Sequence, residues 1–371
     1  MTSWAPLALT TVTAGLLALP ITPALYELWK RGDATPLPTS RHDGRIRNFA
    51  EAFQLRLEPL RPQLERCRAK GETSRTSLEG MEVLLVGGNV GGSISCDSDV
   101  FDFHKQLTKG IAALMSGGDV EIPAGRVVDA DVYADGRVSL GEGAALRAAA
   151  CRDDIILGKN SVVLRWLHTQ ASIYLRRGSI ACGRLSAGQS IELEPETGFH
   201  HMHAPRILTV EDGSGSFSTS RFHDCNSGAI GNDSITDSVN AFKPEQRRFR
   251  IHGNFVLPAG ETLNANVIAT GDLRLCPGAR LFGSVKSYGE TILEKDACVH
   301  GSIVSRRTVR LGPCSFVVGP VIAEDEVLIA AGTLVGGRNA LTTISSRVVQ
   351  IAAGCELHGT VWARTRGTVE G

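Results

Sequence analysis

The sequence predicts a mainly β protein, a parallel β-helix solenoid in two blocks, preceded by a transmembrane helix and a short helical region. Three observations predict it: an apolar–x–apolar triplet that returns about every 18 residues, a long uncharged run near the amino terminus, and a helical pattern between them. The chain of 371 residues is rich in glycine and only 5% aromatic, which suits tight turns around a narrow aliphatic core.

The charge balance argues against a nucleic-acid partner. The 39 Lys and Arg residues equal the 39 Asp and Glu residues, so no global field attracts a polyanion. None of the nine cysteines forms a CxxC pair, which argues against a cysteine zinc site and a disulfide framework and favours a reducing compartment. They are Cys67, Cys96, Cys151, Cys182, Cys225, Cys276, Cys298, Cys314 and Cys355.

Residues 5–26 carry no charge and are long enough, as a helix, to cross a bilayer. Trp4, Tyr26 and Trp29 flank the run, where aromatic rings favour the membrane interface. The nearby positive charges all follow the run, which predicts a single-pass anchor over 1–34 in the inner (cytoplasmic) membrane with the bulk of the chain in the cytoplasm. A cleaved signal peptide and a buried helix are the alternatives.

Residues 35–118 are expected to form a helical and linker region. Apolar residues recur at helical spacing between positions 43 and 72, and Pro59 and Pro62 are expected to break this helix into two pieces. Phe49 begins the apolar face. A strand is expected at 82–86 and a short amphipathic helix at 101–115.

Two blocks of repeats decide the architecture. In block one, over 119–203, the triplet stands at 120–122, 138–140, 155–157, 173–175 and 191–193. In block two, over 251–371, it returns at 255–257, 273–275, 291–293, 309–311 and 327–329. One coil of about 18 residues cannot bury its own inward row, but stacked coils bury a continuous core.

Within block two an apolar or small residue also recurs every six residues, and every third one is small, which predicts three short strands and one tight corner per coil. Gly283, Gly301 and Gly319 are expected at corners with positive φ. Residues 204–250 are expected to be a flexible insertion, and residues 336–343 to lengthen one late coil.

The segments Leu281-Phe282-Gly283-Ser284-Val285, Val299-His300-Gly301-Ser302-Ile303 and Val317-Val318-Gly319-Pro320-Val321 resemble the bactofilins, the bacterial polymer-forming cytoskeletal family. The resemblance covers about 255–329 and returns near 355–363. It implies a right-handed triangular β-helix and nucleotide-free filaments built by end-to-end stacking, often at the membrane.

The residues and the resemblance together predict a membrane-anchored scaffold that assembles with itself, is not an enzyme and needs no cofactor. Its partners would be further copies, the membrane and an envelope or exopolysaccharide machine. Edge pairing between terminal coils is the expected mechanism. The expected self-assembly core is Leu257, Leu275, Leu293, Leu311, Ile329, Val285, Ile303 and Val321.

The sequence also leaves two alternatives to this scaffold function open, a catalytic histidine and a metal site. A left-handed hexapeptide-repeat acyltransferase shares the six-residue period and would use a histidine base, for which His300 and His358 are the candidates. His201 and His203 lie on one side of a strand and are weak candidates for a metal site, against a polar loop.

Overall fold

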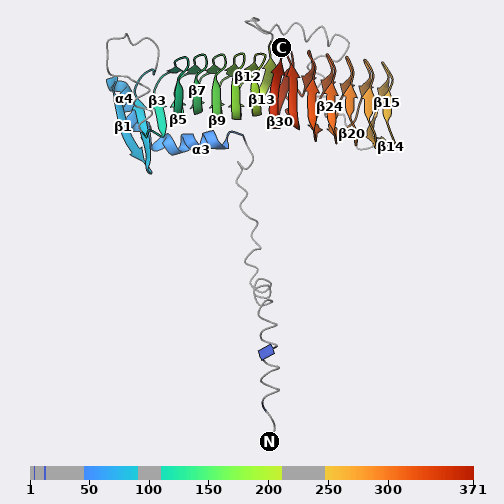
Figure 1. Cartoon of the computed structure of the whole chain (residues 1–371), viewed down its shortest axis with the longest axis horizontal. Coiled ribbons are helices and arrows are strands. Elements are labelled where there is room, and N and C mark those ends of the chain that lie inside the picture. The colour runs from blue at the N-terminus through green and yellow to red at the C-terminus, as the bar shows by residue number, and fades with distance from the viewer. Residues whose placement is uncertain (1–3, 5–11, 14–45, 91–109, 211–246) are drawn as a thin grey trace. The chain divides into compact units, whose positions relative to one another are not determined.

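The structure is a computed structural model that describes residues 4, 12–13, 46–90, 110–210 and 247–371. The chain divides into two units, Met1–Arg45 and Ile46–Gly371. The second unit is a solenoid whose coils pair side by side into one continuous sheet (Figure 1). The predicted mainly β solenoid is confirmed.

The solenoid is preceded by two short helices. α3 (Asn48–Leu57) and α4 (Arg61–Lys70) are joined by the 3-10 turn η2 (Glu58–Leu60). Pro59 and Pro62 lie in the first turns of η2 and α4. A backbone N–H in the first turn has no acceptor within the helix, so proline, which lacks this N–H, costs no hydrogen bond there. The predicted helix, broken at the two prolines, is confirmed.

The face that the helices bury differs from expectation at its start. Phe49 is 51% exposed, whereas Ala50, Phe53 and Leu57 are buried, so the apolar stripe begins one residue later. Gly71 ends α4 with a φ of 65°, the left-handed conformation that glycine adopts freely.

A hairpin links the helices to the first coil. β1 (Thr73–Leu78) and β2 (Met81–Val86) pair antiparallel, and Glu79 and Gly80 between them both have positive φ, as a type I′ turn requires. β2 then pairs in parallel with β3 (Ala113–Ser116). The strand expected at 82–86 is confirmed.

The helix expected at 101–115 is wrong at its carboxyl-terminal end, because that end lies in β3. All four residues of β3 are buried, two facing the solenoid interior and two facing the helices. A strand buried on both faces has no alternation to distinguish it from a helix. Residues 101–109 lie outside the described residues.

Block one alternates a short strand with a long one that bends across two walls at a change of register. The predicted triplets pair directly, Ile155 with Ile173 and Ile173 with Ile191. The strands are β4 (Val120–Ile122), β5 (Val127–Ala134), β6 (Val138–Leu140), β7 (Ala145–Cys151), β8 (Ile155–Leu157), β9 (Val162–Thr169), β10 (Ile173–Leu175), β11 (Ile180–Ala187), β12 (Ser190–Leu193) and β13 (Gly198–Thr209).

Block two has the predicted three short strands per coil until its last two strands, which bend around corners. The strands are β14 (Arg247–Ile251), β15 (Phe255–Leu257), β16 (Thr262–Leu263), β17 (Ala265–Ala269), β18 (Leu273–Leu275), β19 (Arg280–Leu281), β20 (Val285–Ser287), β21 (Thr291–Leu293), β22 (Cys298–Val299), β23 (Ile303–Ser305), β24 (Thr308–Leu311), β25 (Phe316–Val317), β26 (Val321–Ala323), β27 (Glu326–Ile329), β28 (Leu334–Val335), β29 (Thr342–Ala352) and β30 (Glu356–Glu370).

The glycines that recur every 18 residues in block two act differently from expectation. Gly283, Gly301 and Gly319 do not have positive φ; a Cβ at each would instead overlap the backbone of the preceding coil. They permit close approach between coils, not a left-handed turn. The left-handed residues occupy another corner and recur along both blocks: Gly125, Gly143, Asn160, Gly178, Glu196, Gly260, Gly278, Asp296, Cys314, Gly332 and Gly354.

The tight corner of block two is built from small residues, as predicted. Ser287 and Ser305 are buried there, and their hydroxyls find partners within the same coil or in the preceding one. Ser287 Oγ lies 2.7 Å from Thr291 Oγ1, and Ser305 Oγ donates to the Gly289 carbonyl at 2.7 Å. A buried hydroxyl with a partner avoids the desolvation cost of an unpaired one.

The two blocks form one continuous stack, joined end to end. β13 and β30 pair antiparallel, whereas coils within each block pair in parallel. The coils of block two therefore begin at the far end and return toward block one, so the last coils of the two blocks meet (Figure 1). The Phe199 ring occupies the space where a side chain at Gly367 would lie.

The expected boundaries need adjustment. Coil structure begins at β2 and runs to the end of β13, beyond the predicted 119–203, and block two begins with β14, before residue 251. Residues at both ends of the insertion expected at 204–250 belong instead to β13 and β14, and residues 211–246 lie outside the described residues. The Gly337–Ala340 bridge confirms that a turn lengthens the late coil.

Candidate assembly interface

In the described part of the chain, the first coil of block two has no coil packed on its outer side and forms one end of the solenoid. Phe249 and Ile251 stand opposite Val267 and Ala269, whose side chains fill the interior, so both point into the core cross-section. Phe249 is 42% exposed and Ile251 is partly buried, because among the described residues no coil covers them.

The same exposure extends around this coil. Phe255 and Leu263 are only partly buried, although Leu273 and Leu281, one coil further in, are completely buried. In the described part of the chain, β14, β15 and β16 each pair with a strand on one side only. We call this surface the open end; it consists of Phe249, Ile251, Phe255, Leu257 and Leu263.

The opposite end of the solenoid is closed. Leu84, Val86, Val90 and Ile111, the apolar residues of the first coil of block one, are between 2% and 6% exposed. The hairpin strand β1 lies outside β2 and presents a largely polar, exposed sequence. A polar edge of this kind discourages strand pairing, so the two ends differ in their capacity to bind another coil.

Positive charge surrounds the open end. Arg247, Arg248 and Arg250 of β14 are all exposed. In a symmetric antiparallel pairing of two β14 strands centred on Phe249, Arg248 of one copy would face Arg250 of the other. Like charges at this distance repel, so the apolar cross-section must supply the attraction.

A buried ionic network holds the joint between the two blocks. Arg206 of β13 donates to both carboxylate oxygens of Glu356 in β30, at 2.7 and 3.3 Å. His358 places Nε2 3.2 Å from the same carboxylate and Nδ1 2.8 Å from the Pro205 carbonyl oxygen. Burial alone would raise the pKa of Glu356, but the hydrogen bonds and charges of His358 and Arg206 lower it to about 2.

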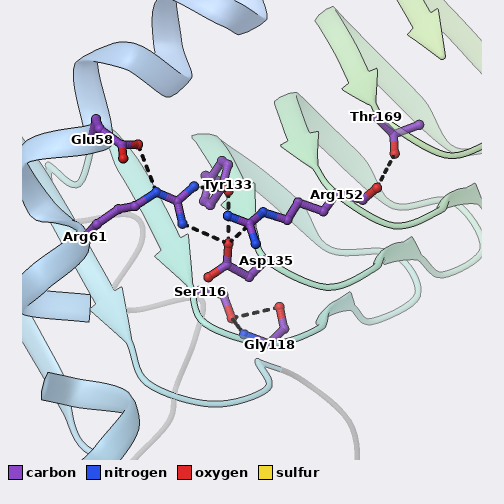
Figure 2. A network of polar contacts seen from close by, with 8 residues as sticks. All are labelled: Glu58, Arg61, Ser116, Gly118, Tyr133, Asp135, Arg152 and Thr169. Atoms are coloured by element: carbon purple, nitrogen blue, oxygen red, sulfur yellow. Dashed lines mark hydrogen bonds and ion pairs between the residues drawn. The ribbon is translucent and has the colours of Figure 1, made fainter. Parts of the chain in front are cut away.

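A second network fastens the helices to block one (Figure 2). Arg61 of α4 donates to the Tyr133 hydroxyl at 2.7 Å, and that hydroxyl donates to Asp135 at 3.0 Å. Glu58 and Arg152 complete the group through ion pairs with Arg61 and Asp135. Burial raises the pKa of Tyr133, with a further contribution from the Asp135 charge. The phenol therefore stays neutral and links Arg61 to Asp135.

The residues expected to form the self-assembly core line the interior of block two and are between 0% and 7% exposed. Leu275, Leu293, Leu311 and Ile329 pair in register down one wall, and they bind coils of the same chain. Leu257 alone among the eight belongs to the open end. The interior row is aliphatic in every coil, so the sequence pattern could not show which coil lies at the end of the stack.

The two metal candidates lie at the joint between blocks. His201 stacks on Trp362 with ring centroids 5.3 Å apart, and His203 Nδ1 is 2.9 Å from Thr360 Oγ1. Burial, with the charges of Arg184 and His203, lowers the pKa of His201 to about 4. Among the described residues, no three His, Cys, Asp or Glu side chains gather as metal ligands.

The two histidines considered for acyl transfer lie apart and are both engaged. His300 stacks on Phe282 with ring centroids 4.3 Å apart, and burial lowers its pKa. His358 is 4% exposed and belongs to the joint network. The sequence did not single out Arg206 and Glu356. Their spacing of 150 residues carries no local signal.

Of the residues expected to flank a membrane anchor, Trp4 is 81% exposed, and Tyr26 and Trp29 lie outside the described residues, as does almost all of 5–26. Within the described ranges, no helix combines the length and apolar character needed to span a bilayer.

Comparison of the chain with protein-family models, with curated proteins and with solved structures finds no match in any of the three.

Proposed function

We propose that this protein is a membrane-anchored, nucleotide-independent scaffold that assembles with itself through the open end. The observation that carries the proposal is the apolar coil formed by β14, β15 and β16, whose outer edge has no strand partner among the described residues. A second copy would satisfy both its backbone groups and its apolar surface. The resemblance to bactofilins supports this function and adds the expectation of a right-handed coil.

The difference between the ends favours pairs of rods over open filaments. A filament of this solenoid would need two adhesive ends, whereas the apolar residues at the block-one end are already buried. A contact between two open ends is isologous and closes at two copies. The uncharged run at 5–26 would hold each pair at the cytoplasmic face of the inner membrane, where it could organise an envelope or polysaccharide machine.

The test is the sedimentation of the full chain in a mild detergent, with and without Phe249→Asp. The wild type should sediment as a dimer and the variant as a monomer. Val256→Asp is the matched control, because Val256 lies in the same coil and is 53% exposed but faces outward opposite Arg274. Circular dichroism confirms that both variants fold.

Each outcome is decisive. A monomeric wild type, or equal loss of dimer in both variants, would overturn self-assembly through the open end. Filaments in electron micrographs would agree with a self-assembling scaffold, but they would refute the claim that the block-one end binds no second copy. Removing residues 1–34 should release the protein from membranes without changing its dimerisation, and membrane retention without them would refute the anchor.

A further inference from the structure

One row of outward-facing positions runs the whole length of the solenoid and crosses the joint between the blocks. Strand register connects each position to the next without interruption. We call it the outer row. In order it is Val83, Ala113, Asp131, Ala148, Trp166, Arg184, His201, Trp362, Ser345, Ile322, Val304, Lys286, Ile268 and Arg250.

In block one this row is covered by the helical segment. Val83, Ala113, Ala148 and Trp166 are buried against α3, η2 and α4. The Phe53 ring of α3 packs on Trp166 with centroids 5.3 Å apart, and Trp166 is 7% exposed. The helical layer begins beside β11, where Arg184 lies over the Phe49 ring at 4.2 Å.

In block two the same row carries apolar side chains that the described residues leave partly exposed. Trp362 is 48% exposed and Ile322 is 41% exposed, and Val304 and Ile268 are partly exposed. The row therefore presents one tryptophan under a helix and a second, three strands away, open to solvent. Large exposed apolar groups in one line are typical of interaction sites.

The open part of the outer row is basic, whereas the covered part is mixed in charge. On the covered wall, Asp131 pairs with Arg147 of the same wall, and Asp135 pairs with Arg61 of α4. The open part supplies Lys286 and Arg250, both exposed, and its outer-row positions hold no acidic residue. A partner complementary to Lys286 and Arg250 would therefore carry acidic residues beside its apolar face.

We propose that the block-two part of the outer row binds an amphipathic helix of another protein, with an apolar face and acidic flanks. Strands lie about 4.8 Å apart, so the four steps from Trp362 to Lys286 span about 19 Å. At about 1.5 Å per residue, a helix of roughly 13 residues covers that length. We infer a helix as the partner because the block-one part of the same outer row already packs against helices of this chain.

The experiment uses two synthetic helical peptides of about 14 residues with the same leucines at helical spacing. One has glutamates along both flanks and the other has lysines. Fluorescence anisotropy measures binding of each to the full chain and to the double variant Trp362→Ser, Ile322→Ser. Leu164→Ser is the matched control, because Leu164 is 54% exposed and lies outside the outer row.

The acidic peptide should bind the wild type and Leu164→Ser alike, and at least about tenfold more weakly to the double variant. The basic peptide should also bind the wild type at least about tenfold more weakly than the acidic one. Failure of the acidic peptide to bind, equal binding of both peptides, or unchanged binding by the double variant would overturn the proposal. Thermal melting confirms that the double variant folds.

A lipid surface is the competing occupant. Vesicles of anionic phospholipid are therefore tested by co-sedimentation with the chain lacking residues 1–34, again with the double variant. Vesicle binding that depends on Trp362 and Ile322, without binding of the acidic peptide, would overturn the helix proposal and assign the surface to membrane contact. Self-assembly through the open end is measured separately, so the two proposals fail independently.

Discussion

Replacing Glu356 by Gln should weaken the joint between the two blocks by about 3 kcal/mol at neutral pH. The pKa of Glu356 is held at about 2, against an ordinary 4.5, and each unit of pKa difference is worth about 1.4 kcal/mol. The substitution keeps the shape of the side chain but leaves the partly buried Arg206 cation without its counter-ion. Removal of one member of a buried pair typically costs about 3–5 kcal/mol, which agrees with this figure.

The effect has a defined pH dependence. The folded-state pKa of Glu356 is lowered, so the carboxylate contributes its full stability above pH 4.5 and loses it as the pH falls toward 2. The difference in free energy of unfolding between wild type and Glu356→Gln should shrink from about 3 kcal/mol at pH 7 to about 1 kcal/mol at pH 3. Urea denaturation, with hydrogen exchange of the β13 and β30 amides, measures it.

A matched control separates burial from charge. Glu79 forms an exposed ion pair with Arg56 at 3.0 Å, and its side chain is 70% exposed. Glu79→Gln should therefore change stability by less than about 1 kcal/mol. If Glu356→Gln costs no more than this control, or if its cost is the same at pH 3 and pH 7, the joint does not depend on the buried carboxylate.

Three further substitutions or measurements probe the solenoid. Gly283→Ala should destabilise block two strongly, because its Cβ would overlap the preceding coil, whereas Gly88→Ala meets open space and should be nearly neutral in thermal melts. Leu293→Asp would bury an unpaired charge and should abolish both the cooperative melt and the dimer; a folded dimer formed by this variant would mean that the core row is misassigned. Maleimide mapping at pH 8 should label exposed Cys182 far faster than buried Cys355, whose pKa burial raises to about 12, and equal rates would contradict this.

The repeating parts of the fold were predictable because they are set by local, periodic interactions. The 18-residue spacing of Leu275, Leu293 and Leu311 became the register between coils, since parallel pairing places equivalent residues opposite each other. The prolines at 59 and 62 placed the helix break correctly for the same reason: they act on the backbone at their own position.

Local sequence misled where a residue's role came from the next coil. Gly283 was expected to adopt positive φ, but the backbone of the preceding coil is what requires a glycine there. Likewise β3 appeared helical because helices cover its outer side, and its burial on two faces removed the alternation expected of a strand.

The sequence by itself determined that this chain winds into coils with an aliphatic interior, because the inward positions repeat at a fixed interval and each coil specifies the next. The tertiary structure alone decided how the two blocks meet, which end stays open, and which stretch of the outer row a helix covers. Those features depend on Arg206 reaching Glu356, on β14 having no coil packed on its outer side in the described part of the chain, and on Phe53 reaching Trp166. Contacts between residues so far apart in the chain leave no period in the sequence, and they arise only when the whole solenoid is assembled.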